Sequence, residues 1–590
     1  MINHVDFYIA QEEKYLEEVK LIKKEISKLS MLRLFVFLAT AFGIYLSFEF
    51  WKIAIIIALI GITIFTILLL KYTKAKRKQS LLKTLVAINK EELEINAGNF
   101  YNREDGFDFQ DPKHYYSLDI DLFGIGSFFQ FINRTSIYES TLKLANLLKA
   151  NNTEDIHLRQ ETIKELGEKP HWRQRFQAIS SLIKTEISAI DIIDWLKKYN
   201  RFIPHKMQWV SLGFSIVSFG LFTCVFLDLI NTNIIFYWMT LGLGITGRYL
   251  KRISNLSQNS DKIKDTFRQY SQLLNEIENE TFTSALLKEK QLNIQSEAEK
   301  ASTIFNQFTK ALDALDNRNN IIVAILGNGF FLLDIRNSYR VEQWIETYKD
   351  VVENWFEVVT FFDAYNSLGN YSFNHPEYVF PEIKKDQKTI LNTKSLGHPL
   401  LKKEKRVDNS IVIDKEQFFI VTGANMAGKS TFLRTVSLNI VMANIGLPVC
   451  AKSCTYSPIK LITSMRTSDS LADDSSYFFS ELTRLKFIVD QIQDTPYFII
   501  LDEILKGTNS TDKAIGSQKF VEKLVASNST GIIATHDLSL CEIEKKLDEV
   551  KNFYFDAEII NDELHFDYRF KEGICKNMNA SFLLKKMEII

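Results

Sequence analysis

Residues 418–432 read FFIVTGANMAGKSTF and combine an apolar run, a glycine turn and the start of a helical pattern. The apolar run 418–421 predicts a strand, and the spacing from Gly423 to Ser430 is G-x-x-x-x-G-K-S. In a loop of this spacing, backbone N–H groups and a helix N-terminus face the phosphates of a bound nucleotide. The stretch therefore predicts a strand, a phosphate loop and a helix, as in an α/β nucleotide-binding domain.

This loop supplies candidate ligands for ATP and Mg²⁺. Lys429 would neutralise the β- and γ-phosphates, and Ser430 would ligate Mg²⁺. A chance glycine-rich turn is the alternative interpretation of the motif taken alone. The predicted nucleotide-binding residues of the loop are Gly423, Ala424, Asn425, Met426, Ala427, Gly428, Lys429, Ser430 and Thr431.

Two later strand ends strengthen this prediction. The apolar run 497–501 is followed by Asp502 and Glu503, and the run 531–534 is followed closely by His536. A parallel sheet delivers such side chains to nucleotide bound at its carboxyl edge. We expect Asp502 to hold Mg²⁺, directly or through water, and Glu503 to orient and deprotonate the attacking water. His536 would sense or stabilise the γ-phosphate, although a lone histidine there is more often structural.

Two pairs of apolar runs lie upstream. The first pair spans 34–50 and 53–70 with Glu49 as its only charge apart from Lys52 in the turn, and the second spans 209–227 and 234–246. Each pair fits a transmembrane hairpin. Lysines and arginines flank both pairs, so the positive-inside rule places both termini and the C-terminal domain in the cytoplasm of a cell whose cytoplasmic membrane holds the hairpins. Buried core helices are the alternative, but helices of this length normally keep a polar stripe.

Net charge, the N-terminal segment, the aromatic residues and the cysteines give weaker indications of function. The formal net charge is −1, so no global basic field indicates nucleic acid, although a local groove could bind it. The charged, helix-like N-terminus is no cleavable signal peptide. An aromatic-rich region at 344–365 is typical of a buried core more than of a base-stacking platform. Reduced, structural cysteines are expected from the sparse set Cys224, Cys450, Cys454, Cys541 and Cys575.

Several separately placed motifs resemble one family. The loop TGANMAGKST resembles the TGPNMGGKST of the MutS family, including Asn425 and Met426, which generic phosphate loops do not share. DEILKGTNSTD resembles that family's DEIGRGTSTYD, and ATHDLSL resembles its ATHYFEL. The segment 464–485 is similar to the one that carries the MutS signature loop, with Glu481 where that family has an acidic residue. Less specific likeness extends upstream to DIDLFGIGSFFQFINRTS and to RQETIKEL, which begins at Arg159-Gln160.

The resemblance implies an ATP-binding-cassette type of ATPase. Two ATPase domains would face each other in a homodimer, and Ser475 or Ser476 would contact the γ-phosphate held by the other subunit. ATP binding and hydrolysis would open and close helical arms like a clamp. Ala424 and Ala427 replace the family's proline and glycine, but both are small, so nucleotide binding should survive. The other departures are Leu505-Lys506 in place of Gly-Arg and Asp473-Asp474 in place of Ser-Gly.

We therefore expect a multi-domain chain with an α-helical MutS-like core, transmembrane helical hairpins and a C-terminal α/β P-loop ATPase domain of the ABC type. We do not expect the mismatch-reading domain of the family, because the first hairpin takes its place and no Phe-x-Glu wedge occurs before residue 130. The expected segments are an N-terminal helix with the first hairpin (1–80), the first part of a cytoplasmic helical core (81–206), the second hairpin (207–250), a clamp-like second part of the core (251–400) and the ATPase domain (401–590).

Three functions of such a clamp stay open at this point. DNA, mismatched or branched, is what the resemblance implies in a repair-related role, although the near-zero net charge and the missing wedge speak against it. The hairpins indicate instead an ATPase for membrane remodelling or transport coupling. A third alternative is a signalling protein whose ATP cycle controls partner binding.

Overall fold

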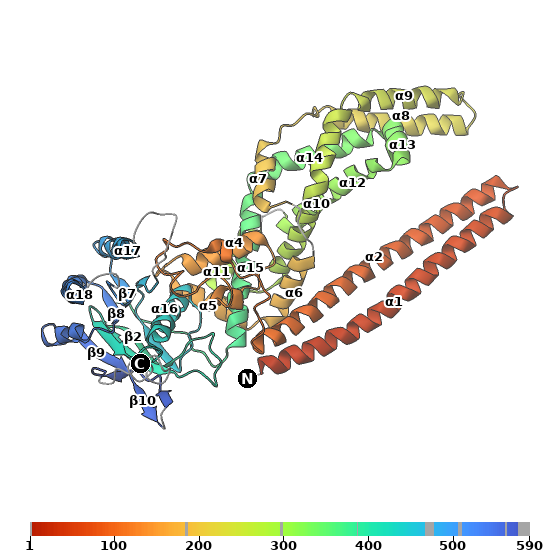
Figure 1. Cartoon of the computed structure of the whole chain (residues 1–590). Helices are drawn as coiled ribbons and strands as arrows, with labels where there is room; N and C mark the ends of the chain where they lie inside the picture. Colours follow the sequence, from red (N-terminus) through yellow and green to blue (C-terminus); the bar gives the residue numbers. More distant parts are fainter. Residues whose placement is uncertain are drawn as a thin grey trace.

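Two antiparallel helices of unusual length begin the chain. The structure is a computed structural model that describes residues 3–182, 187–295, 299–385, 387–466, 477–505, 510–560 and 563–575. Helix α1 (His4–Leu46) starts where the Asn3 side chain accepts a hydrogen bond from the backbone of Val5, and α2 (Trp51–Asn96) packs along it (Figure 1). The predicted runs 34–50 and 53–70 form only the outer end of this hairpin.

The charged N-terminal pattern and the first apolar run are not separate helices. Both belong to the single helix α1, because a change from charged to apolar side chains does not interrupt the backbone hydrogen bonds of a helix. The outer end of the hairpin exposes large apolar side chains, with Phe35 67% and Leu59 60% exposed.

A second apolar tip is made by three helices. Helix α8 (Met207–Phe226) and α9 (Asn233–Gly247) form the predicted second pair, and α13 (Ile321–Phe331) packs against both. Sequence analysis did not identify α13. Among the described residues, α1, α2 and α8 are long and apolar enough to cross a membrane, and α13 with the sharply bent α14 would make a fourth candidate if the pair is one span.

A helical core joins the two apolar tips to the C-terminal domain. Helix α15 (Val352–Asn374) runs through its centre, and Trp355, Phe362 and Tyr365 on it are buried, so the aromatic-rich region is core, as predicted. The charged stretch that follows the second pair forms two packed helices, α10 (Leu250–Asn279) and α12 (Ala301–Asp316). The other core elements are η1 (Phe107–Phe109), α3 (Phe128–Ile132), α4 (Tyr138–Lys149), α5 (Ile156–Gly167), α6 (Pro170–Leu182), α7 (Ala189–Lys198), α11 (Ala285–Leu292), η2 (Asn317–Asn319) and α14 (Leu333–Tyr348).

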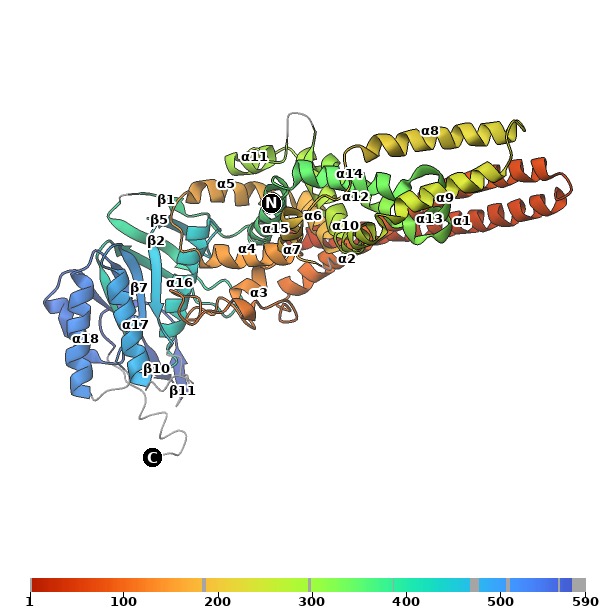
Figure 2. The ribbon, with the colours of Figure 1, turned by 90° about the horizontal axis from the view of Figure 1, so that it is seen from above.

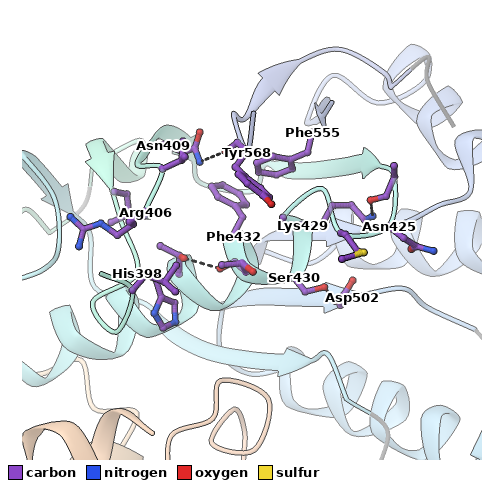
Figure 3. A pocket seen from close by; sticks show the side chains of 18 of the residues that line it. His398, Arg406, Asn409, Asn425, Lys429, Ser430, Phe432, Asp502, Phe555 and Tyr568 are labelled. Carbon is purple, nitrogen blue, oxygen red and sulfur yellow. Dashed lines mark hydrogen bonds between the residues drawn. The ribbon is translucent and has the colours of Figure 1, made fainter. Parts of the chain in front are cut away.

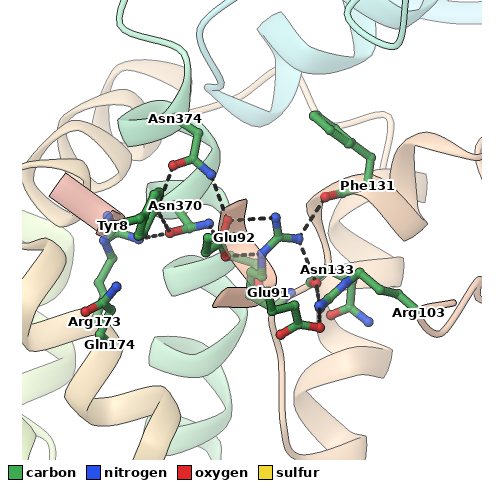
Figure 4. A network of polar contacts seen from close by, with 12 residues as sticks. Tyr8, Glu91, Glu92, Arg103, Phe131, Asn133, Arg173, Gln174, Asn370 and Asn374 are labelled. Carbon is green, nitrogen blue, oxygen red and sulfur yellow. Dashed lines mark hydrogen bonds and ion pairs between the residues drawn. The ribbon is translucent and has the colours of Figure 1, made fainter. Parts of the chain in front are cut away.

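A buried polar cluster fixes the base of the long hairpin to this core (Figure 4). Glu92 of α2 forms an ion pair with Arg134 and accepts hydrogen bonds of 3.0 Å from the side-chain amides of Asn370 and Asn374 on α15. The Tyr8 hydroxyl of α1 donates to Asn374 over 2.7 Å. Burial alone would raise the pKa of Glu92, but Arg134 and the hydrogen bonds outweigh burial and lower it, so the carboxylate stays charged.

The C-terminal domain is built on a six-stranded sheet of order β12-β9-β4-β8-β7-β6. All its strand pairs are parallel except β12 with β9, and β4 lies between β8 and β9. These strands are β4 (Phe418–Gly423), β6 (Lys460–Ser464), β7 (Tyr497–Asp502), β8 (Thr530–Ala534), β9 (Val550–Phe555) and β12 (Lys571–Glu572). The helices are α16 (Lys429–Ile445), α17 (Tyr477–Gln491), α18 (Ser510–Val525) and η3 (Leu538–Lys545).

A second sheet of order β1-β5-β2-β3 and a ribbon complete the domain. Their strands are β1 (Glu382–Ile383), β2 (Thr389–Leu396), β3 (Asn409–Asp414), β5 (Ser453–Tyr456), β10 (Ala557–Ile560) and β11 (Glu563–Phe566). Figures 1 and 2 show the C-terminal domain at one end of the molecule and both apolar tips at the opposite end. The helical core therefore lies between the sheet domain and the tips.

Candidate functional site

The loop between β4 and α16 has the predicted strand, turn and helix. Gly423 has φ +147°, and a Cβ there would lie 2.6 Å from the carbonyl oxygen of Phe555, so the position requires glycine. Gly428 has φ +102° and precedes the first residue of α16. Ala424 and Ala427 are outside the positive-φ region, which explains why this chain can carry alanine at both. Gly423 and Ala427 shape the loop, whereas the other loop residues line a cavity.

Lys429 lies folded back over this loop. Its ammonium group donates to the carbonyl oxygens of Gly423 at 2.8 Å and Ala424 at 3.0 Å, and it lies 3.2 Å from Nε2 of His536. The lysine is buried, and burial lowers its pKa, although nearby carboxylates oppose the effect. A buried ammonium whose partners are all neutral is ready to exchange them for an anion.

Ser430 and Asp502 meet on the neighbouring side of the cavity. The Ser430 hydroxyl, in the first turn of α16, donates to Oδ2 of Asp502 at the end of β7 over 2.5 Å (Figure 3). Hydroxyl and carboxylate oxygens are ligands that Mg²⁺ prefers, and here they come from two elements to one point. The two residues therefore fit the Mg²⁺ role that the sequence predicts.

Glu503 and His536 form a pair beside Asp502. Nε2 of His536 lies 3.3 Å from Oε1 of Glu503. Glu503 has φ +55°, and its backbone N–H donates to the carbonyl of Ala534 at the end of β8 over 2.9 Å. Burial lowers the pKa of His536, and the charge of Lys429 lowers it further, so the imidazole is neutral at pH 7. The structure thus brings together all five charged or polar groups predicted from three strand ends.

Glu481 fixes the backbone two residues beyond Glu503 through a hydrogen bond. It is 3% exposed, and its Oε1 accepts a 2.5 Å hydrogen bond from the backbone N–H of Leu505. Leu505 has φ +59°, a conformation in which glycine is unstrained and leucine costs about 1 kcal/mol. The departure from Gly to Leu at this position therefore leaves a strained residue that Glu481 holds in place.

Part of the cavity wall comes from residues that sequence analysis did not assign to the site. The cavity has a volume of about 570 Å³, and it is lined by His398 and Arg406 and also by Phe555 and Tyr568, which lie beside the loop glycines (Figure 3). Burial and two nearby arginines lower the pKa of His398 to about 4. These residues lie on separate segments without a shared motif, so no local sequence pattern assigns them to the site. Ser475, Ser476, Asp473, Asp474 and Lys506 lie outside the described residues.

The helical core contacts this domain close to the loop. Oδ2 of Asp119 accepts from the hydroxyl of Thr463 at 2.5 Å, and its Oδ1 accepts from the backbone of Arg466 at 2.8 Å. Arg434, one turn along α16 from Ser430, donates to the carbonyl oxygen of Asp119 at 3.2 Å. This segment therefore touches both the helix that follows the loop and the end of β6.

A second contact joins α5 to the far end of α16. Arg159 donates to the carbonyl of Asn444 at 2.8 Å, and Gln160 donates to the carbonyl of Pro381 at 3.0 Å. A Cβ on Gly446 would lie 2.9 Å from that of Arg159, so the two helices approach closely. Arg159 and Gln160 thus both donate to main-chain carbonyls across a domain contact.

Comparison with known proteins shows what the C-terminal domain is similar to. The model of MutS domain V matches residues 419–586, which include the loop and the polar groups around it. The chain is 38% identical to the DNA mismatch repair protein MutS of Fusobacterium nucleatum over 185 residues and 30% identical to that of Bacillus subtilis over 243 residues. It is 32% identical to the human MutS protein homolog 4 over 225 residues. These matches show that the C-terminal domain is similar to MutS domain V.

The MutS relationship covers a limited part of each protein. The three alignments include 30%, 40% and 36% of this chain, and 20%, 27% and 23% of the three relatives in the same order. The chain thus spans about a quarter of the length of the curated relatives that it matches. The MutS likeness therefore describes the C-terminal domain more than the helical arms.

Proposed function

We propose that this chain is a membrane-anchored MutS-like ATPase that binds ATP with Mg²⁺, hydrolyses it, and uses the cycle to move its helical arms. The observation that carries the proposal is the convergence of Lys429, Ser430, Asp502, Glu503 and His536 on one cavity beside a glycine loop. Mismatch repair in the names of the relatives is consistent with it.

In this proposal each side chain has a distinct task. Lys429 exchanges its carbonyl partners for the β- and γ-phosphate oxygens, and Thr431 lies beside it at the helix N-terminus, where the helix dipole favours anions. Ser430 and Asp502 would hold Mg²⁺, which neutralises charge on the phosphates when bound. The aromatic ring of Tyr568, which is 42% exposed and lines the cavity, fits the nucleobase.

Glu503 is the proposed general base for hydrolysis of ATP. Glu503 takes a proton from water as the water oxygen bonds to the γ-phosphorus, and the bond from that phosphorus to the bridging oxygen of ADP breaks. Neutral His536 has one N–H, which Nε2, 3.3 Å from Oε1 of Glu503, would donate to that carboxylate or, once ATP is bound, to the γ-phosphate.

Replacement of Glu503 tests this assignment. Glu503→Gln should lower ATP turnover by about 10²- to 10⁴-fold while ATP still binds, because the amide keeps the shape and loses the base. Lys429→Ala should abolish binding of a fluorescent ATP analogue. Glu522→Gln, exposed on α18, is the matched control. Unchanged turnover in both Glu503→Gln and Lys429→Ala would rule the site out.

The ligand of the arms is proposed to be DNA, with a homodimer formed through the two C-terminal domains. Detergent-solubilised protein should bind mismatched or branched duplexes with an affinity that falls steeply with salt. Turnover that depends on lipid and ignores DNA would favour the second candidate, a membrane-associated ATPase for remodelling, transport coupling or signalling. That alternative is supported by the exposed apolar tips at the end opposite the site.

Membrane anchoring is proposed for the outer ends of α1 and α2 and for α8 with α9, in the cytoplasmic membrane with both termini and the C-terminal domain in the cytoplasm. The exposed large apolar side chains along these helices, which are between 39% and 83% exposed, support it. The protein should stay with membranes during extraction at alkaline pH.

A further inference from the structure

Helix α13 is an apolar element that the two-hairpin interpretation leaves unexplained. Its sequence, IIVAILGNGFF, contains no charged residue, and Asn328 is its one amide. The helix packs closely on α9, because a Cβ on Gly242 would lie 2.4 Å from the carbonyl oxygen of Gly329. A Cβ on Gly329 would lie 2.4 Å from the side chain of Met239. Such contacts between small residues are typical of helices that associate in lipid.

Hydrogen bonds between the helices satisfy the backbone where α13 ends. The helix breaks at Leu332, which has φ +49°, so the last carbonyls lose their helical partners. The hydroxyl of Ser218 on α8 donates to the carbonyl of Phe330 at 2.6 Å, and Trp238 Nε1 donates to the same hydroxyl at 2.8 Å. A broken helix needs such internal partners where water is absent.

The opposite face of α13 is apolar and exposed. Ile321 is 73% exposed, Ile322 64%, Ile325 43% and Leu326 48%. The neighbouring helix α8 is also apolar and exposed: Phe219, whose ring lies 5.6 Å from that of Phe331 at the end of α13, is 64% exposed. Water is a poor solvent for apolar surfaces of this kind.

Charged residues stand on both sides of this segment in the chain. Arg318 precedes it and forms an ion pair of 3.3 Å with Asp334, which follows it. Arg336 and Arg340 come next on α14. Since Arg318 and Asp334 meet, the chain enters and leaves the apolar zone at one side. Eleven helical residues rise about 16 Å, roughly half of the hydrocarbon thickness.

We propose that α13 is embedded in the hydrocarbon of the bilayer as a third, non-spanning helix of the α8–α9 tip, with Ile321, Ile322, Ile325 and Leu326 against acyl chains. The proposal rests on the membrane anchoring proposed above. DNA does not fit this face, because α13 carries no cation to meet a phosphate. Acyl chains fit it, because α13 packs against α8, an apolar helix long enough to span.

Site-specific fluorescence tests this placement in the full chain. An environment-sensitive fluorescent amino acid replaces Ile322 on α13, Phe219 on α8 or Ile515 on α18 by codon suppression, and the protein is reconstituted into phosphatidylcholine and phosphatidylglycerol vesicles. Ile515 is 52% exposed on the C-terminal domain and serves as the aqueous control. Brominated acyl chains should quench the probes at 322 and 219 to a similar extent and leave the probe at 515 unchanged.

Each outcome separates the two levels of the proposal. Quenching at 219 with none at 322 would overturn the embedding of α13 and leave the anchoring intact. No quenching at either position would overturn the anchoring itself. A probe at 322 that is protected from both bromine and aqueous iodide would indicate a second copy of the chain on this face, and would equally overturn contact with lipid. A monodisperse elution profile in detergent shows that each labelled variant is folded.

Discussion

At the scale of single residues, the site contains residues that are either desolvated or held in a strained backbone conformation. Lys429 is buried with carbonyl partners, Glu503 and Leu505 take positive φ, and His398 is kept neutral. Strained or desolvated groups of this kind concentrate where a ligand will relieve them. The cavity is therefore prepared for a charged ligand before that ligand arrives.

His398 makes stability depend on pH. Its pKa of about 4 in the folded chain lies below the 6.5 of an unfolded histidine, so the unfolded chain takes up a proton first as the pH falls. Stability attributable to His398 is unchanged above pH 6.5 and is lost between pH 6.5 and 4, amounting to about 2 kcal/mol by pH 5. The backbone N–H of Leu400 donates to its Nδ1 at 3.4 Å, which agrees with a neutral ring.

The variant His398→Gln should lose less stability on acidification. The measurement is the midpoint of thermal unfolding at pH 7.5 and pH 5, with His565→Gln on β11 as the control. Equal pH dependence in the wild type and in His398→Gln would contradict the assignment.

At the scale of elements, the sequence predicted those helices and strands whose pattern lies within one continuous stretch of the chain. The β4 strand, its loop and α16 followed from an apolar run and glycine spacing, and α8 and α9 matched their predicted runs closely. Helix α13 was missed because eleven apolar residues fall below the length that identifies a span. Tyr568 and Arg406 reach the cavity only through the pairing of distant segments, which no local pattern contains.

The base of the α1–α2 hairpin offers a prediction at this scale. Glu92→Ala should weaken the attachment of α2 by about 3–5 kcal/mol, because Arg134 would be left buried without its carboxylate. Amide hydrogen exchange along α1 near Tyr8 should accelerate, while exchange in α16 should stay as in the wild type. The control is Glu94→Ala, which changes an exposed residue two positions along α2. Protection of Tyr8 and its neighbours that survives in Glu92→Ala would show that the cluster does not hold the hairpin.

At the scale of the whole molecule, one segment connects the site to the arms. Asp119 binds Thr463 and Arg466 in the sheet domain and is contacted by Arg434 of α16. The same segment leads within a few residues to α3, which packs against α15. A change at the loop therefore has a short, hydrogen-bonded route into the core on which both tips are mounted.

Asp119→Ala should separate ATP turnover from arm movement. Turnover should persist within a few-fold, since Asp119 does not line the cavity, whereas the nucleotide-dependent change in distance between probes at Phe42 and Phe226 should shrink. Double electron–electron resonance with and without ATP measures that distance, and Asp108→Ala is the control. A distance change of wild-type size in Asp119→Ala would assign the coupling to the α5–α16 contact instead.

The length of the α1–α2 hairpin has a mechanical consequence. Helix α2 has 46 residues and is therefore about 70 Å long, so a rotation of about 5° at its base moves the outer end by about 6 Å. By the same lever ratio, a small sideways force at the outer end produces a large torque on the cluster around Glu92. Bending of a membrane that holds that end would thus be felt at the base of the hairpin, which makes the hairpin as suitable for sensing membrane shape as for moving it.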